Sequence, residues 1–105
     1  MGACLAEAHA LTSEGYGYLG AHHPMAPQAD WASAFTVMWN ALLDDIVGVG
    51  GYAPEEADAL RAALARHRGV FERPVAASLL HMDVWHQNIL ADEKGRLTGL
   101  LDWDS

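Results

Sequence analysis

Three polar side chains occupy a short segment between two apolar runs in the last quarter of the chain: His81, Asp83 and Asn88. A fourth, Asp102, follows Asn88 by fourteen residues, again after an apolar run. A carboxylate can accept the proton of an attacking hydroxyl group, and carboxylate and amide oxygens are ligands that suit Mg²⁺. The spacing lets one rigid segment present a base toward an acceptor and a ligand toward a metal. Such a layout is typical of a loop that transfers phosphoryl groups.

A β-hairpin between Asn88 and Asp102 is expected to bring these two side chains together. Residues 89–91 and 97–101 are mostly apolar and can pair around the turn 92–96, in which Gly95 can adopt a positive φ angle. Each polar residue taken alone is commonly a cap or a turn residue. The combination of all four at these offsets favours a metal-dependent site instead.

The spacing His-x-Asp-x-x-x-x-Asn matches the catalytic loop of the protein-kinase fold. Within that fold, the sequence resembles the aminoglycoside phosphotransferase family, strongly over residues 79–104 and weakly over 1–70. The resemblance implies that Asp83 is the catalytic base, that Asn88 and Asp102 are metal ligands, and that ATP and Mg²⁺ are the cofactors. For His81 the resemblance implies a structural role, in which the ring braces the backbone of the loop.

Two positions depart from related patterns. The family commonly has glycine where Met82 stands, so the local backbone or the acceptor side is expected to differ. Protein kinases usually carry arginine there and Asp-Phe-Gly at the second metal site, where this chain has Asp102-Trp103-Asp104. A small-molecule kinase is therefore favoured over a protein kinase. The implied acceptor is a hydroxyl group of a small molecule, such as an aminoglycoside or another antibiotic, which would connect the chain with antibiotic resistance.

The resemblance also implies an α+β fold, namely a protein-kinase-like C-lobe that is mainly helical and carries a catalytic-loop β-hairpin near its C-terminus. We expect a helical part at 1–72, and the catalytic loop with its metal-binding hairpin at 76–105. The nucleotide-binding N-lobe is expected to be absent, because Lys94 is the only lysine and lies in the hairpin turn.

A glycine pattern, Gly15-x-Gly17-x-x-Gly20, does not change this expectation. The pattern follows a predicted helix, whereas a nucleotide-binding loop of this kind follows a strand. On this interpretation the chain is a truncated form of a phosphotransferase. The alternative is a non-catalytic remnant or a binding module that has no activity alone.

Three helices are expected before the loop. The first covers residues 3–11, and the third begins at Pro54, with acidic residues in its first turn and basic residues in its last. The second follows Asp30, a favourable N-cap residue. Its apolar side chains recur at the helical period and predict a packed face, formed by Trp31, Phe35, Met38, Trp39, Leu42, Leu43 and Ile46.

Four residues are candidates for contacts with the acceptor. Asp44 and Asp45 lie near the end of the second helix, where carboxylates oppose the helix dipole, so they could bind a cationic acceptor. The alternative for both is a solvated helix end. Trp85 and His86 lie inside the loop and could line the acceptor site, with a packed tryptophan and an exposed histidine as the alternatives. The pair His22-His23 is interpreted as an exposed loop pair rather than a metal site.

The formal net charge of −8, from 14 acidic and 6 basic residues, argues against nucleic acid or a membrane surface as a partner. Both of those partners bind basic patches. Cys4 is the single cysteine, and no apolar run approaches the roughly 20 residues that span a bilayer. We therefore expect a cytoplasmic protein. Because 51% of the residues are hydrophobic, self-association through uncovered apolar faces is also expected.

Overall fold

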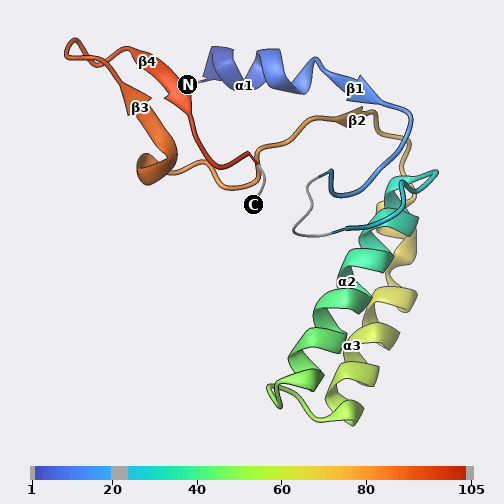
Figure 1. The fold of residues 1–105 in the computed structure, drawn as a ribbon. Helices are drawn as coiled ribbons and strands as arrows, with labels where there is room; N and C mark the ends of the chain where they lie inside the picture. Colours follow the sequence, from blue (N-terminus) through green and yellow to red (C-terminus); the bar gives the residue numbers. More distant parts are fainter. Residues whose placement is uncertain (1, 20–23, 104–105) are drawn as a thin grey trace. The chain divides into compact units, whose positions relative to one another are not determined.

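The computed structural model describes residues 2–19 and 24–103. Within these residues the fold is α+β, as expected, with helices and two small antiparallel sheets (Figure 1). The α-helices are α1 (Gly2–His9), α2 (Trp31–Gly48) and α3 (Pro54–Arg66). The strands are β1 (Thr12–Ser13), β2 (Ala77–Ser78), β3 (Ile89–Ala91) and β4 (Leu97–Leu100), and the 3₁₀ segments are η1 (Arg68–Phe71) and η2 (His86–Asn88).

The described residues form two compact units. One unit lies within residues 1–13, 18–25 and 76–105, and the other within 14–17 and 26–75. The first helix, α1, therefore belongs with the loop and the hairpin and not with α2 and α3. The expected division into a helical part at 1–72 and a loop-and-hairpin part at 76–105 was a division along the sequence, and it stays a prediction. Helix α1 groups with the loop because β1, which follows α1, pairs with β2, which leads into the loop.

The helices α2 and α3 begin at the residues that the sequence predicted. The Asp30 side chain accepts a hydrogen bond of 2.8 Å from the Ser33 backbone N–H, as expected of an N-cap residue. That bond, together with one from the Ser33 hydroxyl group, lowers the pKa of the Asp30 carboxyl group. Pro54 is the first residue of α3, and the Glu56 carboxylate accepts a hydrogen bond of 3.1 Å from the backbone N–H of Ala53.

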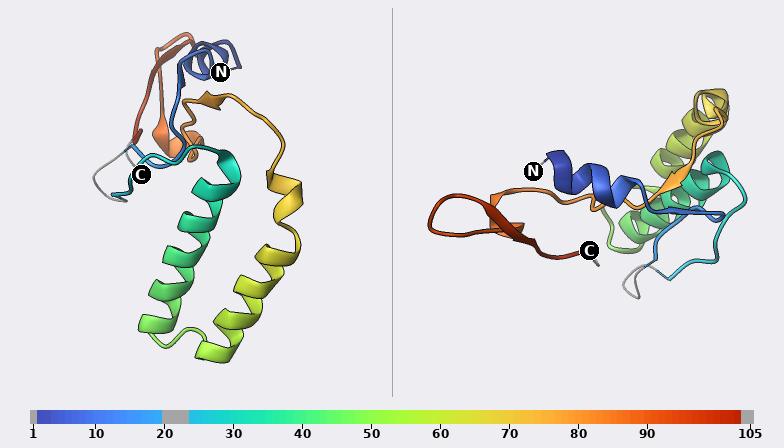
Figure 2. Two further views of the ribbon diagram at one scale, coloured as in Figure 1. Left: turned by 90° about the vertical axis from the view of Figure 1, so that its right-hand side faces the viewer. Right: turned by 90° about the horizontal axis from the view of Figure 1, so that it is seen from above.

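The helices α2 and α3 pack side by side (Figure 2). Ala34, Leu43 and Ala57 are almost fully buried, with exposed fractions of 0%, 2% and 2%. The Trp39 indole N–H donates to the Leu60 carbonyl across the two helices, at 3.2 Å. The predicted apolar stripe of α2 is thus a packing face over most of its length, but Leu42 departs from it and is 54% exposed.

The other unit contains two antiparallel pairs. In the first, Thr12 of β1 pairs with Ser78 of β2, and the Leu79 backbone N–H extends the pairing by donating to the Leu11 carbonyl at 2.9 Å. Each strand has only two residues. The pairing nevertheless joins segments that are more than sixty residues apart, and it places α1 in the same unit as the loop.

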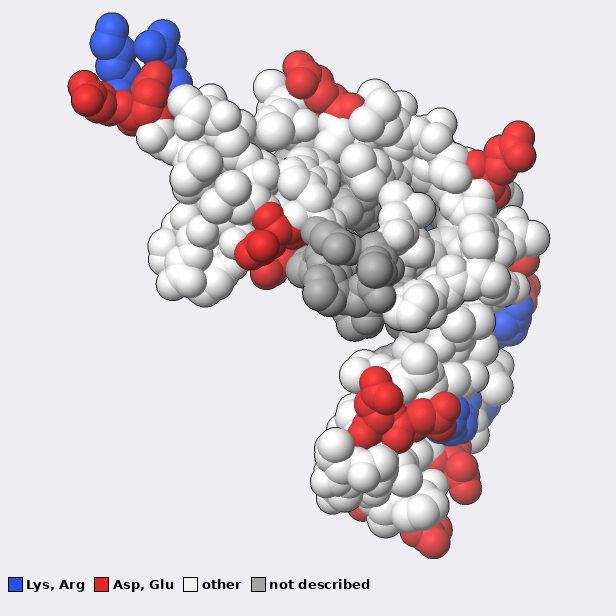
Figure 3. Space-filling model, in the orientation of Figure 1, with Lys and Arg blue, Asp and Glu red and all other residues white. Residues whose placement is uncertain are grey.

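The second pair is the predicted hairpin. Ile89 pairs with Leu100, and the strands are joined by a turn in which Gly95 has a φ angle of 79°. The Asp92 carboxylate accepts hydrogen bonds of 2.9 Å from the backbone N–H groups of both Lys94 and Arg96, so it organises the turn from within. The charged side chains of this turn form the red and blue group at the hairpin tip (Figure 3). No helix of the described residues has the length and apolar character needed to cross a membrane.

Candidate active site

The His81 ring joins the two segments that carry the predicted catalytic and metal-binding residues. Its exposed fraction is 3%. The Nδ1 atom accepts a hydrogen bond of 3.1 Å from the Asp83 backbone N–H, so the proton of the neutral ring lies on Nε2. From there Nε2 donates to the Leu101 carbonyl at 2.5 Å. A single buried ring therefore holds the backbone next to Asp83 and the backbone next to Asp102.

Asn88 makes the second connection within the loop. Its side chain is 5% exposed, and Nδ2 donates to the backbone carbonyl of Asp83 at 2.9 Å and to the Asp83 carboxylate oxygen Oδ2 at 3.2 Å. Because the nitrogen faces Asp83, the amide oxygen Oδ1 is the atom available to a metal ion. The Asn88 backbone carbonyl also accepts a hydrogen bond of 2.7 Å from the Leu101 N–H.

Asp102 lies just beyond these connections. Its carboxylate is exposed and has no hydrogen bond or ion pair with the other described residues. Its φ angle is 57°, in the left-handed region, which aspartate tolerates better than most residues. Unusual backbone angles that persist in a structure are found preferentially at functional sites.

Met82 is the other non-glycine residue with a positive φ angle, 74°, within the described chain. Any residue with a Cβ atom is disfavoured in this conformation, since its Cβ approaches the following carbonyl oxygen. The backbone here thus has a conformation suited to glycine, although the residue is methionine. The left-handed turn directs the chain from His81 into Asp83, and the Met82 side chain is 71% exposed.

The oxygen atoms of Asn88 and Asp102 suit Mg²⁺ better than a metal ion whose ligands must all come from protein side chains. No group of three or more histidine, cysteine, aspartate or glutamate side chains within residues 2–19 and 24–103 could enclose a metal ion. Mg²⁺ keeps several waters and commonly uses only one or two carboxylates together with substrate phosphates. Asn88 Oδ1 and the Asp102 carboxylate match that requirement in chemistry and in number.

The structure places the remaining predicted residues in different surroundings. Trp85 and His86 are exposed in the loop, with their rings in edge contact at 5.1 Å and 72°. Asp44 and Asp45 lie in the other unit. Asp44 forms an ion pair with Arg61, which links α2 to α3, whereas Asp45 is simply exposed. The pair His22-His23 and Asp104 lie outside the described residues.

Trp103 is part of this arrangement and was not expected from the sequence. Its indole N–H donates to the Leu100 carbonyl at 2.9 Å, and its ring meets the His81 ring edge-on, with centroids 4.7 Å apart. A tryptophan next to a predicted metal-binding aspartate could have signalled this role, since a packed indole usually finds an acceptor for its N–H. Trp103 thus packs against the histidine that joins the two segments carrying the predicted site residues.

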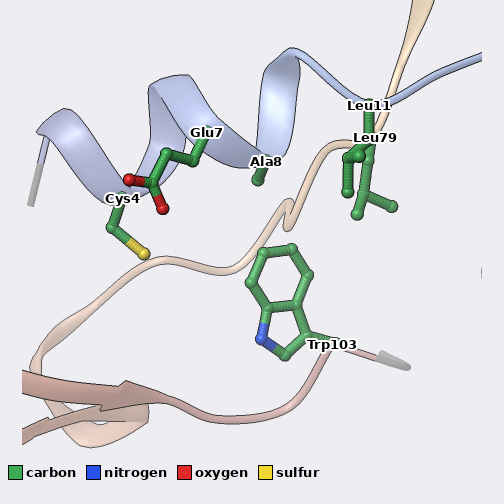
Figure 4. A pocket seen from close by; sticks show the side chains of 6 residues that line it. All are labelled: Cys4, Glu7, Ala8, Leu11, Leu79 and Trp103. Atoms are coloured by element: carbon green, nitrogen blue, oxygen red, sulfur yellow. The ribbon is translucent and has the colours of Figure 1, made fainter.

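An open hollow of about 340 Å³ lies on the same unit, beside Trp103. Figure 4 shows the indole ring across the hollow from α1. The side chains that line it are mostly apolar and are contributed by Cys4, Glu7, Ala8, Leu11, Leu79 and Trp103. None of the predicted catalytic or metal-binding residues lines this hollow.

A model of the phosphotransferase enzyme family matches residues 1–105. Neither the curated proteins nor the solved structures gave a match to the chain.

Proposed function

Because the chain belongs to the phosphotransferase enzyme family, we propose that its loop transfers the γ-phosphoryl group of ATP to a hydroxyl group of a small molecule. The observation that carries this proposal is the pair of hydrogen bonds from Asn88 Nδ2 to Asp83, one to the backbone and one to the carboxylate. These bonds orient a base and a metal ligand together, which is the arrangement that phosphoryl transfer requires.

Asp83 is the base in this proposal. Since Oδ2 accepts from Asn88, the other carboxylate oxygen is available to accept the proton of the acceptor hydroxyl group. The hydroxyl oxygen then forms a bond to the γ-phosphorus, the bond from that phosphorus to the β,γ-bridging oxygen breaks, and ADP leaves. A positioned base of this kind contributes roughly 10²–10⁴-fold to the rate.

Asn88 and Asp102 would hold Mg²⁺, which when bound offsets the negative charge of the ATP phosphates. The loop-bearing unit has few positive side chains that could offset the charge of the ATP phosphates, which agrees with a need for the metal ion. Its only basic side chains other than histidine, Lys94 and Arg96, lie at the hairpin turn, and Arg96 already pairs with Asp92. His81 contributes indirectly, by fixing the backbone on both sides of the site.

The test is calorimetric titration of the 105-residue chain with ATP in the presence of Mg²⁺. Asp102→Asn removes one negative charge but keeps the side-chain size and the tolerance for a left-handed backbone. We expect it to weaken the binding of MgATP at least tenfold. Glu93→Gln is the matched control, because it removes the same charge from an exposed position in the hairpin turn.

Three outcomes separate the hypotheses. Binding that is lost in Asp102→Asn and kept in Glu93→Gln supports the proposal. Equal weakening in both variants would point to a general effect of net charge and would remove Asp102 from the site. Absence of binding in the unmodified chain would favour the alternative of a non-catalytic binding module.

A further inference from the structure

The side chains on either side of Asp83 are apolar and exposed. Met82 is 71% exposed, Val84 39% and Trp85 45%. Exposed apolar side chains that gather at one place mark binding surfaces more often than scattered ones do. An acceptor hydroxyl group must approach the Asp83 carboxylate, and these are the exposed apolar side chains next to it in the sequence.

We propose that the acceptor is an uncharged alcohol with an apolar body, recognised by contact with Met82, Val84 and Trp85. This inference rests on the proposed function, in which Asp83 takes the proton of the hydroxyl group. It adds the chemical class of the acceptor.

The loop itself offers few groups that could pair with a polycationic acceptor. Within residues 79–91, all of which are described, Asp83 is the only acidic residue. Binding an ammonium group in a partly dry site costs free energy unless a carboxylate or a similar acceptor pairs with it. An acceptor with several ammonium groups would find a single carboxylate in this segment, and that carboxylate is needed for the hydroxyl proton. The Asp102 carboxylate is assigned to the metal ion.

The apolar neighbours, in contrast, suit a ligand without charge. Binding sites for small molecules are lined mainly by apolar and aromatic side chains, with a few polar groups that set the orientation. Here Trp85 offers the largest apolar surface, and Asp83 offers the orienting polar group. The face of an indole ring can also attract a single cation, so a decisive test must compare molecules that differ only in charge.

The experiment uses two alcohols of nearly identical shape, 4-tert-butylbenzyl alcohol and its cationic counterpart 4-(trimethylammonio)benzyl alcohol. Their dissociation constants for the 105-residue chain are measured by saturation-transfer NMR titration. We expect the neutral alcohol to bind at least fivefold more tightly. Trp85→Ser and Met82→Ser should each weaken its binding at least threefold. Tyr52→Ser, which removes an exposed aromatic ring from the other unit, should leave it unchanged.

Equal or tighter binding of the cationic alcohol would overturn the inference, as would binding that neither Trp85→Ser nor Met82→Ser changes. Calorimetry with MgATP on the same protein separates this failure from a failure of the proposed function. If MgATP binding depends on Asp102 while the cationic alcohol is preferred, only the acceptor class is wrong. If MgATP does not bind, the proposed function fails, and an alcohol held at Trp85 is then a ligand of a non-catalytic site and not an acceptor.

Discussion

Replacing Met82 with glycine is expected to stabilise the loop even though it removes a side chain. The left-handed φ angle of 74° costs a residue with a Cβ atom roughly 1–2 kcal/mol. Glycine avoids this cost but loses roughly 0.5–1 kcal/mol more backbone entropy on folding. Because the Met82 side chain is 71% exposed, its removal sacrifices little packing. The net gain in local stability should be about 0.5–1 kcal/mol.

Amide hydrogen exchange followed by NMR measures this gain at the right place. The Asp83 amide donates to His81 and the Leu101 amide donates to Asn88, so both must open before they exchange. A gain of that size slows their exchange roughly two- to fivefold. The Ala57 amide, which donates within the first turn of α3 in the other unit, should exchange at an unchanged rate.

Met82→Ala is the control that isolates the backbone effect. It removes the side chain beyond Cβ but keeps the steric cost of the left-handed conformation. Exchange of the Asp83 and Leu101 amides should therefore change little in this variant. The reasoning is refuted if alanine slows exchange as much as glycine does, or if glycine makes exchange faster.

Three further predictions concern buried, catalytic and capping residues. His81→Ala should lower the free energy of unfolding in urea by roughly 2–4 kcal/mol, since the Asp83 N–H and the Leu101 carbonyl lose a buried partner; a loss below about 1 kcal/mol would contradict the bridging role. Asp83→Asn should lower kcat by roughly 10²–10⁴ with little change in MgATP affinity, and an equal loss of MgATP binding in calorimetry would instead make Asp83 a metal ligand. Hydrogen bonds from Ser33 lower the pKa of Asp30, so the ionised carboxylate stabilises α2. The difference in unfolding free energy between the unmodified chain and Asp30→Ala should therefore stay constant above about pH 4. It should shrink in more acidic solution, where the carboxylate becomes protonated. A difference that does not shrink at any pH below about 4 would argue against that cap.

The elements with strong local signals were predictable from the sequence. Asp30 begins α2 and Pro54 begins α3, because a capping side chain and a proline act on the backbone within one turn. The β3–β4 hairpin was predictable for the same reason, since apolar runs flank a turn that contains Gly95. The local link between Asn88 and Asp83 also lies within a single loop.

The rest of the site depends on contacts between distant parts of the chain. The hydrogen bond from His81 to Leu101 spans twenty residues, and no periodic pattern encodes it. The strands β1 and β2 are too short to show alternation, so the placement of α1 with the loop could not be inferred. The left-handed backbone at Met82 was not predicted. The resembled family commonly has glycine there, which prefers such a conformation, but the methionine led us to expect that the backbone or the acceptor side differs.

The pairing of Ile89 with Leu100 fixes the open end of the hairpin. The geometry of that end therefore does not depend on the length of the turn. The distance between Asn88 and Asp102 is determined where the strands begin and end, whereas the turn at 92–96 lies at the opposite end of the ladder (Figure 1). Extra residues between Lys94 and Gly95 would extend into solvent without altering that distance. The turn is therefore a natural place to graft an affinity tag or a spectroscopic label, and a protein carrying one there would keep both ends of the proposed metal site in register.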